Sequence, residues 1–223
     1  MDKFKVYSLD SSFDLMQIKN KLSSFQRSSD INFEFTPIKF TDFFLSYKYS
    51  EKKILETSFL DKNGNEQTIE YLHIDSFEFR IINSKNKFYI LLINPSRSLK
   101  LFKQYLVELL DYKIGFSEIE INPLDLLSKI EKLSNSEFFV LSMEIKDIIF
   151  NNNTSGVMTL KSLKDIRNYY KEIVTNKNFK INKILISNND FFRGKLILCK
   201  DASFQIESLN SIKLMELILD NLN

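Results

Sequence analysis

Two segments of the chain carry apolar residues at helical spacing, and they align with each other without gaps. Residues 97–113 and 161–177 are identical at six aligned positions and chemically similar at six more. An apolar stripe at this spacing predicts a helix with one buried face. The alignment itself predicts an internal duplication of a strand–strand–helix–strand unit, with one copy at about 77–133 and the other at about 138–207.

The first 75 residues show a different pattern and are expected to form an N-terminal α+β portion. A helix is predicted after the capping residues 10–12, because apolar residues then recur at partly helical spacing. Aromatic and polar residues alternate through 31–80, which is typical of strands. Asn63 and Gly64 predict a hairpin turn at 61–65, since an Asn-Gly pair readily adopts positive φ.

Residues 76–223 are expected to form a second, duplicated domain. The segment 88–93 is apolar on both faces and should be a central strand. Asn-Pro pairs at 94–95 and 122–123 predict the starts of two helices. Further strands are expected at 77–82, 116–121, 138–150, 157–160, 180–187, 191–199 and 203–207, and further helices at about 162–176 and 208–222. The predicted fold class is α+β, with a mixed sheet covered by helices.

Composition narrows the range of functions. Hydrophobic residues make up 43% of the 223 residues and charged residues 27%, as in soluble globular proteins. No apolar run approaches the roughly 20 residues that span a bilayer, and the first residues lack a secretion signal. A cytoplasmic protein without membrane contact is therefore expected. The four glycines form no phosphate-binding cluster, and the lone His73 and lone Cys199 are expected to be structural residues.

Two sets of carboxylates could form a metal-binding or catalytic site. Glu118 and Glu120 share one face of a predicted strand and could hold Mg²⁺, but a solvated strand face explains them equally well. Asp125, Glu144 and Lys146 have the spacing of a Mg²⁺-dependent nuclease, but chance produces Glu-x-Lys at this content of Glu and Lys. We therefore expect no catalytic residue, no metal and no cofactor, and a nuclease remains the second alternative function.

Charge is unevenly distributed although the net charge is only +2. Residues 161–200 carry ten basic and three acidic side chains, whereas 108–147 carry nine acidic and four basic ones. A non-enzymatic protein that binds double-stranded DNA through basic helix ridges, as a homodimer, is predicted. The expected contact residues are Arg97, Lys100, Lys103, Lys161, Lys164, Arg167, Lys171, Arg193 and Lys195. The alternative is a structural subunit of a complex, with 108–147 as its surface for a protein partner.

The duplicated plan, together with the strand that turns through Asn-Pro into a basic helix at 88–103, resembles one group of known proteins. These are the pseudo-two-fold DNA-binding proteins around the phage-exclusion protein Rex A and the recombination-associated protein RdgC. The resemblance covers about 76–207 and is one of architecture, so it assigns no role to any residue. It implies non-catalytic DNA binding in phage defence or in mobile-element biology.

Overall fold

A computed structural model describes residues 1–24, 32–85, 87–151, 154–174, 179–208 and 211–222. The chain divides into two compact units. The arm unit comprises Ser8–Ser117, and the C-terminal unit comprises Met1–Tyr7 together with Glu118–Asn223. Both units combine antiparallel strands with helices, so the predicted α+β class is confirmed.

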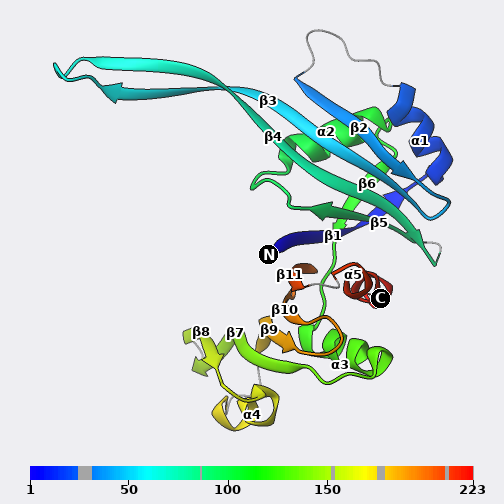
Figure 1. Cartoon of the computed structure of the whole chain (residues 1–223), viewed down its shortest axis with the longest axis vertical. Coiled ribbons are helices and arrows are strands. Elements are labelled where there is room, and N and C mark those ends of the chain that lie inside the picture. The colour runs from blue at the N-terminus through cyan, green and yellow to red at the C-terminus, as the bar shows by residue number, and fades with distance from the viewer. Residues whose placement is uncertain (25–31, 86, 152–153, 175–178, 209–210, 223) are drawn as a thin grey trace. The chain divides into compact units, whose positions relative to one another are not determined.

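The arm unit is built on the antiparallel strand order β2-β3-β4-β5 (Figure 1). Helix α2 packs Phe102 against aromatic rings of this sheet, with ring centroids 5.0 Å from Phe77 and 5.1 Å from Phe79. Strand β5 is buried on both faces, as predicted. The elements are the end of β1 (Asp2–Ser11), α1 (Leu15–Ser24), β2 (Phe33–Phe40), β3 (Phe44–Leu60), β4 (Glu66–Ser84), β5 (Lys87–Ile93), α2 (Lys100–Leu109) and β6 (Ile114–Glu118).

Strands β3 and β4 are much longer than their neighbours. They pair with each other from Phe44↔Ile82 to Leu60↔Glu66, whereas β2 pairs with β3 only as far as Glu51 and β5 pairs with β4 only from Glu78. The two strands therefore continue beyond the sheet as a ribbon, which Figure 1 shows in cyan. The predicted turn closes this ribbon, with Gly64 at φ 82°. The domain boundary expected after residue 75 falls inside β4.

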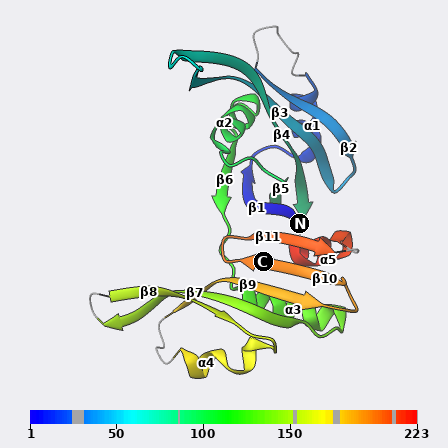
Figure 2. The same ribbon diagram turned by 60° about the vertical axis from the view of Figure 1, so that its left-hand side comes forward.

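The C-terminal unit has the antiparallel strand order β1-β11-β10-β9-β7-β8. Helix α3 contacts β9, α5 contacts β11, and the two helices contact each other, so both cover the same face of this sheet (Figure 2). The elements are α3 (Pro123–Ser134), β7 (Phe139–Asn151), β8 (Thr154–Lys161), the 3₁₀ turn η1 (Ile166–Asn168), α4 (Tyr170–Ile173), β9 (Lys180–Asn188), β10 (Gly194–Cys199), β11 (Ser203–Ser208) and α5 (Ser211–Asp220).

Local signals predicted some helix starts and missed others. Helix α3 begins as expected, since Asn122 Oδ1 accepts a hydrogen bond from Leu124 N–H at 3.1 Å. Helix α2 starts at Lys100 instead of residue 95, and the expected cap Asn94 has φ 50°, whereas a residue that caps a helix start has an extended backbone. In α1 the cap is Asp14, whose Oδ1 accepts from Gln17 N–H at 2.8 Å, and not a residue of 10–12.

The structure does not show the predicted internal duplication. In the described part of the segment expected as a helix, residues 162–174, the helical elements are only η1 and the four-residue α4, so the prediction of one long helix is wrong. Its counterpart 97–113 contains the ten-residue α2. The third strands of the two supposed copies also differ, because β6 pairs with β1 whereas β9 pairs with β7 and β10. Leu163, a member of the expected apolar stripe, is 102% exposed.

Candidate nucleic-acid interface

The basic ridge predicted on the second helix does not form. Lys164 lies in the loop after β8, where its N–H donates to Ser162 Oγ at 3.0 Å. Arg167 belongs to η1, and Lys171 belongs to α4. Lys164 and Lys171 are exposed, but the three residues no longer share one helical face. A continuous line of phosphate contacts from this segment therefore loses its geometric basis.

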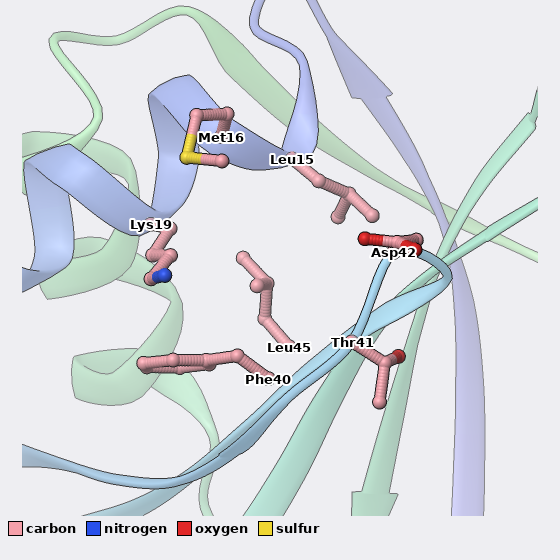
Figure 3. Close-up of a pocket in the computed structure, with 7 residues that line it drawn as sticks. All are labelled: Leu15, Met16, Lys19, Phe40, Thr41, Asp42 and Leu45. Atoms are coloured by element: carbon pink, nitrogen blue, oxygen red, sulfur yellow. The ribbon is translucent and has the colours of Figure 1, made fainter.

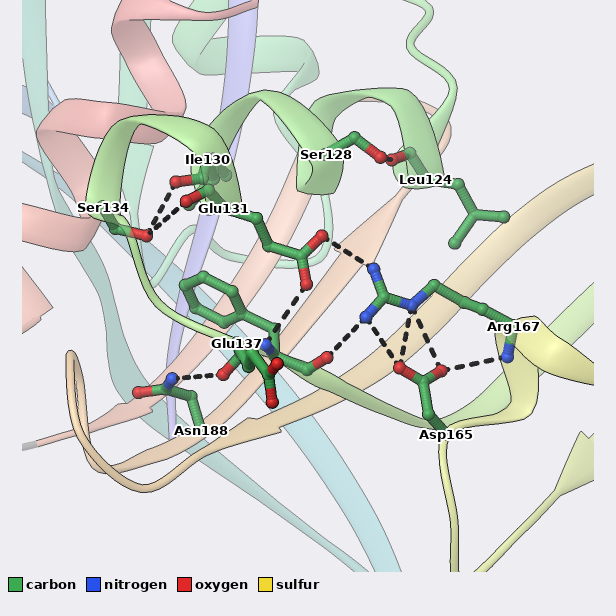
Figure 4. A network of polar contacts seen from close by, with 10 residues as sticks. Leu124, Ser128, Ile130, Glu131, Ser134, Glu137, Asp165, Arg167 and Asn188 are labelled. Atoms are coloured by element: carbon green, nitrogen blue, oxygen red, sulfur yellow. Dashed lines mark hydrogen bonds and ion pairs between the residues drawn. The ribbon is translucent and has the colours of Figure 1, made fainter.

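Arg167 is instead the centre of a polar network (Figure 4). Its Nη1 donates to Glu131 Oε2 at 2.7 Å, and its Nη2 donates to Asp165 Oδ2 and to the carbonyl oxygen of Phe138, each at 2.6 Å. Its Nε donates to Asp165 Oδ2 at 2.9 Å. Burial lowers the pKa of the guanidinium, but its hydrogen bonds to Asp165 and Glu131 outweigh burial and raise that pKa.

The network ties three elements together and uses all three nitrogens of the guanidinium. Glu131 is on α3, Phe138 precedes β7, and Asp165 caps η1 by accepting from Arg167 N–H at 3.0 Å. Next to it, Asn188 Nδ2 donates to the Glu137 carbonyl oxygen at 2.7 Å and secures the same turn. Arg167 therefore has a structural role in the C-terminal unit, and phosphate would have to compete with two carboxylates.

The first predicted ridge is partly retained in the arm unit. Arg97 is exposed but precedes α2. Lys100 and Lys103 are three residues apart on α2 and so lie on neighbouring positions of its surface. Lys103 is half-buried, and its Nζ lies 5.3 Å from the centroid of the Phe116 ring. This cluster therefore offers Arg97 and Lys100 as exposed cations.

The strongest grouping of lysines lies on a sheet face of the C-terminal unit that α3 and α5 leave uncovered. Along β9 and β10 every second residue is buried, as in Ile184, Ile186, Leu196 and Leu198. The residues between them point to the opposite face, because side chains alternate along a strand. One row across six paired strands consists of Lys3, Gln205, Ile197, Leu185, Ser142 and Lys161.

Two more lysines lie on this face beside that row. Lys183 pairs with Cys199 on one side and with Glu144 on the other, and Lys195 pairs with Ser187 and with Glu207. We call the exposed lysines Lys161, Lys183 and Lys195 the lysine face. Within the described ranges, none of the three forms an ion pair shorter than 4.0 Å.

Lys5 also lies on this face but is engaged with carboxylates. Its Nζ is 2.9 Å from Glu118 Oε2 and 2.9 Å from Asp201 Oδ2, and the side chain is 12% exposed. Burial lowers the pKa of Lys5, but hydrogen bonds to the two carboxylates raise it above its usual value. Lys5 is therefore held in place by the protein itself, in contrast to the lysine face.

Sequence reasoning found part of this surface. Lys161 and Lys195 were predicted contacts and lie on the lysine face, and Arg193 is exposed in the turn before β10, with φ 50°. Lys183 was not selected. The signal for it was its position one residue before Ile184 and three before Ile186, which places Lys183 on the opposite side of the strand from both.

The carboxylates of the supposed nuclease pattern have separate surroundings. Glu144 Oε1 accepts from Asn182 Nδ2 at 2.6 Å and lies 3.4 Å from Lys146 Nζ. Asp125, in the first turn of α3, lines a cavity of about 310 Å³ with Tyr170, Lys180 and others. Among the described residues, no group of three or more His, Cys, Asp or Glu side chains could hold a metal ion.

A second cavity, of about 290 Å³, lies in the arm unit between α1 and the turn joining β2 to β3 (Figure 3). Its lining is mostly apolar, with Lys19 and Asp42 as the charged members. Lys19 Nζ lies 4.8 Å from the centroid of the Phe40 ring. The cavity is at the lower limit of the size of small-molecule sites, which is about 300 Å³, and the Thr41 hydroxyl in its lining hydrogen-bonds the backbone of Phe43 and Phe44.

Six of the nine acidic side chains in 108–147, the region predicted as a protein-binding surface, form ion pairs within the described fold. Glu131 binds Arg167, Glu118 binds Lys5, and Asp111 Oδ2 lies 2.5 Å from Lys21 Nζ. These carboxylates therefore stabilise the units to which they belong, and fewer charges remain for a basic partner than the sequence indicates.

Comparison with known proteins adds no relative to this description. None of the protein-family models matches the sequence, and no curated protein matches it. No helix in the described part of the chain is long and apolar enough to cross a membrane.

Proposed function

We propose that the protein is a non-catalytic double-stranded DNA-binding protein that contacts the phosphate backbone with the lysine face. The observation that carries this proposal is the position of three exposed lysines on β8, β9 and β10, on the sheet face opposite α3 and α5. Cations on one surface neutralise phosphates and release condensed counterions, which drives binding without reading the base sequence.

The spacing of the lysines suits a polyanion. Lys183 and Ser187 are four residues apart on β9, and Lys195 is the cross-strand partner of Ser187. Four residues of strand span about 13 Å, which is about four steps of one DNA strand at 3.4 Å each. The lysine face therefore spans several phosphates and not a single one.

The scarcity of exposed aromatic rings on this face supports a duplex over a single strand. Proteins that bind single strands stack bases on aromatic side chains. Among the described residues of this face, Phe139 is the only exposed large aromatic side chain, at 42%. Contacts between lysine side chains and the phosphate backbone of a duplex need no exposed aromatic rings.

The test is the salt dependence of DNA binding, measured by fluorescence anisotropy with a labelled duplex. The triple variant Lys161→Glu, Lys183→Glu and Lys195→Glu should flatten the log–log salt slope by between two and three, at roughly 0.9 per lost phosphate contact. The matched control reverses three exposed lysines elsewhere in the same unit, Lys132, Lys164 and Lys171, and should leave the slope near that of the wild type.

Two results would contradict the proposal. No detectable binding of wild-type protein to duplex DNA at low salt would remove the function itself. If both triple variants flatten the log–log salt slope equally, binding depends on net charge and not on this surface. A larger effect in the control variant would move the interface to the loop and α4.

A further inference from the structure

The ribbon of β3 and β4 carries the largest group of exposed apolar side chains in the described chain. We call residues 54–74 the arm; apart from the turn residue Asp61, every residue in it is exposed. Eight of the 21 exposed large hydrophobic side chains lie here, a concentration that isolated surface residues do not explain. They are Ile54, Leu55, Phe59, Leu60, Ile69, Tyr71, Leu72 and Ile74.

The register distributes these residues over both faces of the arm. Ile54 is paired with Leu72 on one face, and Ile74 and Leu60 lie on the same face. Leu55 is paired with Tyr71 on the other face, and Phe59 and Ile69 are diagonal neighbours there. An ordinary surface hairpin places its apolar residues on one face, against its own core. This arm has apolar residues on both faces and no core at either.

The root of the arm is fixed by a polar cluster. Glu51 and Asp75 are cross-strand partners, and Lys53 Nζ lies 3.3 Å from the first and 3.0 Å from the second. Tyr49 Oη donates to Glu51 Oε2 at 3.0 Å, and His73 Nε2 lies 3.1 Å from Asp75 Oδ1. Lysine thus offsets the repulsion of two opposed carboxylates, and this arrangement holds the two strands in register where the arm leaves the sheet.

The charge of the arm determines which partner fits. Residues 54–74 contain Glu56, Asp61, Glu66 and Glu70 against one lysine, so the arm is acidic. Such a surface repels the phosphate backbone of DNA. It also repels the arm of a second copy, since Glu56 and Glu70 are cross-strand partners in the middle of one face. A surface with basic side chains around apolar ones complements it.

The dimensions of the arm favour a contact through both of its faces. The seven residue pairs from Ile54↔Leu72 to Leu60↔Glu66 span about 24 Å, and two strands are about 10 Å wide. One face therefore has a flat footprint of about 240 Å², and the two faces together have about 480 Å². Enclosure of both faces thus doubles the area that the arm offers to a partner.

We propose that the arm inserts into an apolar cleft with a basic rim on a partner protein, and that the cleft covers both faces of the ribbon. This proposal is independent of DNA binding, because the lysine face belongs to the other compact unit. The arm supplies apolar contacts at the centre of the interface, and its carboxylates supply the charge complementary to the rim.

The first part of the experiment identifies the partner by photo-crosslinking of the full-length protein in its host cells. A photoreactive benzoylphenylalanine replaces Tyr71 on one face or Leu72 on the other, and Tyr112, which is 74% exposed outside the arm, is the control position. We expect one and the same protein to be crosslinked from both arm positions and not from the control.

The second part measures the affinity of the purified crosslinked protein by calorimetry. The double variants Leu55→Thr with Tyr71→Thr, and Ile54→Thr with Leu72→Thr, each remove a cross-strand apolar pair and keep strand propensity. Each should weaken binding at least about 30-fold, while Tyr112→Asn, a residue type that tolerates the φ of 58° at this position, should leave the affinity unchanged. The affinity should also fall as salt is raised.

Several outcomes would overturn the proposal. Crosslinks to a second copy, with a dimer in sedimentation velocity, would make the arm a self-association element. Crosslinks to nucleic acid, or from one face only, would exclude a protein cleft that encloses the ribbon. Absence of any crosslink specific to the arm positions would also exclude such a cleft. All of these can be scored whether or not the lysine face binds DNA.

Discussion

Replacement of Arg167 by methionine should destabilise the C-terminal unit. Methionine keeps the aliphatic stem but removes every donor, so Glu131 and Asp165 lose their cation and the Phe138 carbonyl oxygen loses a hydrogen bond of 2.6 Å. The carboxylate side chains are 21% and 15% exposed, so both stay largely out of water.

The size of the effect follows from this burial. Removal of one partner from a fully buried ion pair costs about 3–5 kcal/mol. Partial exposure lets water solvate the two carboxylates, so we expect about 2–3 kcal/mol in the free energy of unfolding for Arg167→Met. At about 4 °C per kcal/mol for units of this size, the melting temperature of the affected transition should fall by about 10 °C.

Thermal and urea denaturation followed by circular dichroism provide the assay. Arg193→Met is the matched control, because Arg193 is exposed and forms no ion pair with the described residues, and it should change stability by less than about 0.5 kcal/mol. An Arg167→Met variant as stable as this control would refute the structural role. DNA affinity of Arg167→Met, measured where it is folded, should equal that of the wild type, because the structure assigns Arg167 to the fold.

Two further predictions concern stability. Gly194→Ala should destabilise the protein by roughly 1–3 kcal/mol or more in urea denaturation, because a Cβ there would lie 1.9 Å from the Glu207 carbonyl oxygen. A Cβ at Gly64 meets no atom within 4 Å, so Gly64→Ala should cost only about 1 kcal/mol, for its φ of 82°. Equal costs for the two substitutions would contradict this prediction. Burial raises the pKa of Asp201, but hydrogen bonds from Ser203 and Lys5 outweigh burial and lower that pKa below the ordinary value of 3.8. The contribution of Asp201 to stability is therefore present above pH 3.8 and is lost as pH falls through the lowered pKa. Asp201→Asn should reduce the loss of stability on acidification below pH 3.8. The same dependence of stability on pH in the variant and the wild type would contradict this role of Asp201.

Several elements were determined by local sequence alone. Asn122 before Pro123 starts α3 because the cap and the proline act within one turn. Gly64 closes the hairpin because its backbone adopts positive φ at low cost. The buried strand β5 was predictable because few apolar runs of this length are stable with either face in water.

Tertiary structure decided the features on which the function depends. The helical pattern did not give a long helix in 161–174, because Arg167 gains three protein partners in η1 and Lys161 ends β8. A periodic pattern reports only local preference, and tertiary contacts override it. The lysines selected from that helix therefore separated, and Lys161 joined Lys183 and Lys195 through strand pairing between distant segments.

The arm shows the same limit for strands. Ile54 and Leu72 have the type and spacing of residues in a half-buried strand, and nothing in their neighbourhood distinguishes them from Tyr49 or Phe77 in the core. What separates the two groups is where β2 and β5 stop pairing with the longer β3 and β4. Strand propensity and alternation are local properties, whereas the whole sheet determines how many strands pair with a given strand. Only the tertiary structure therefore shows which apolar residues remain uncovered.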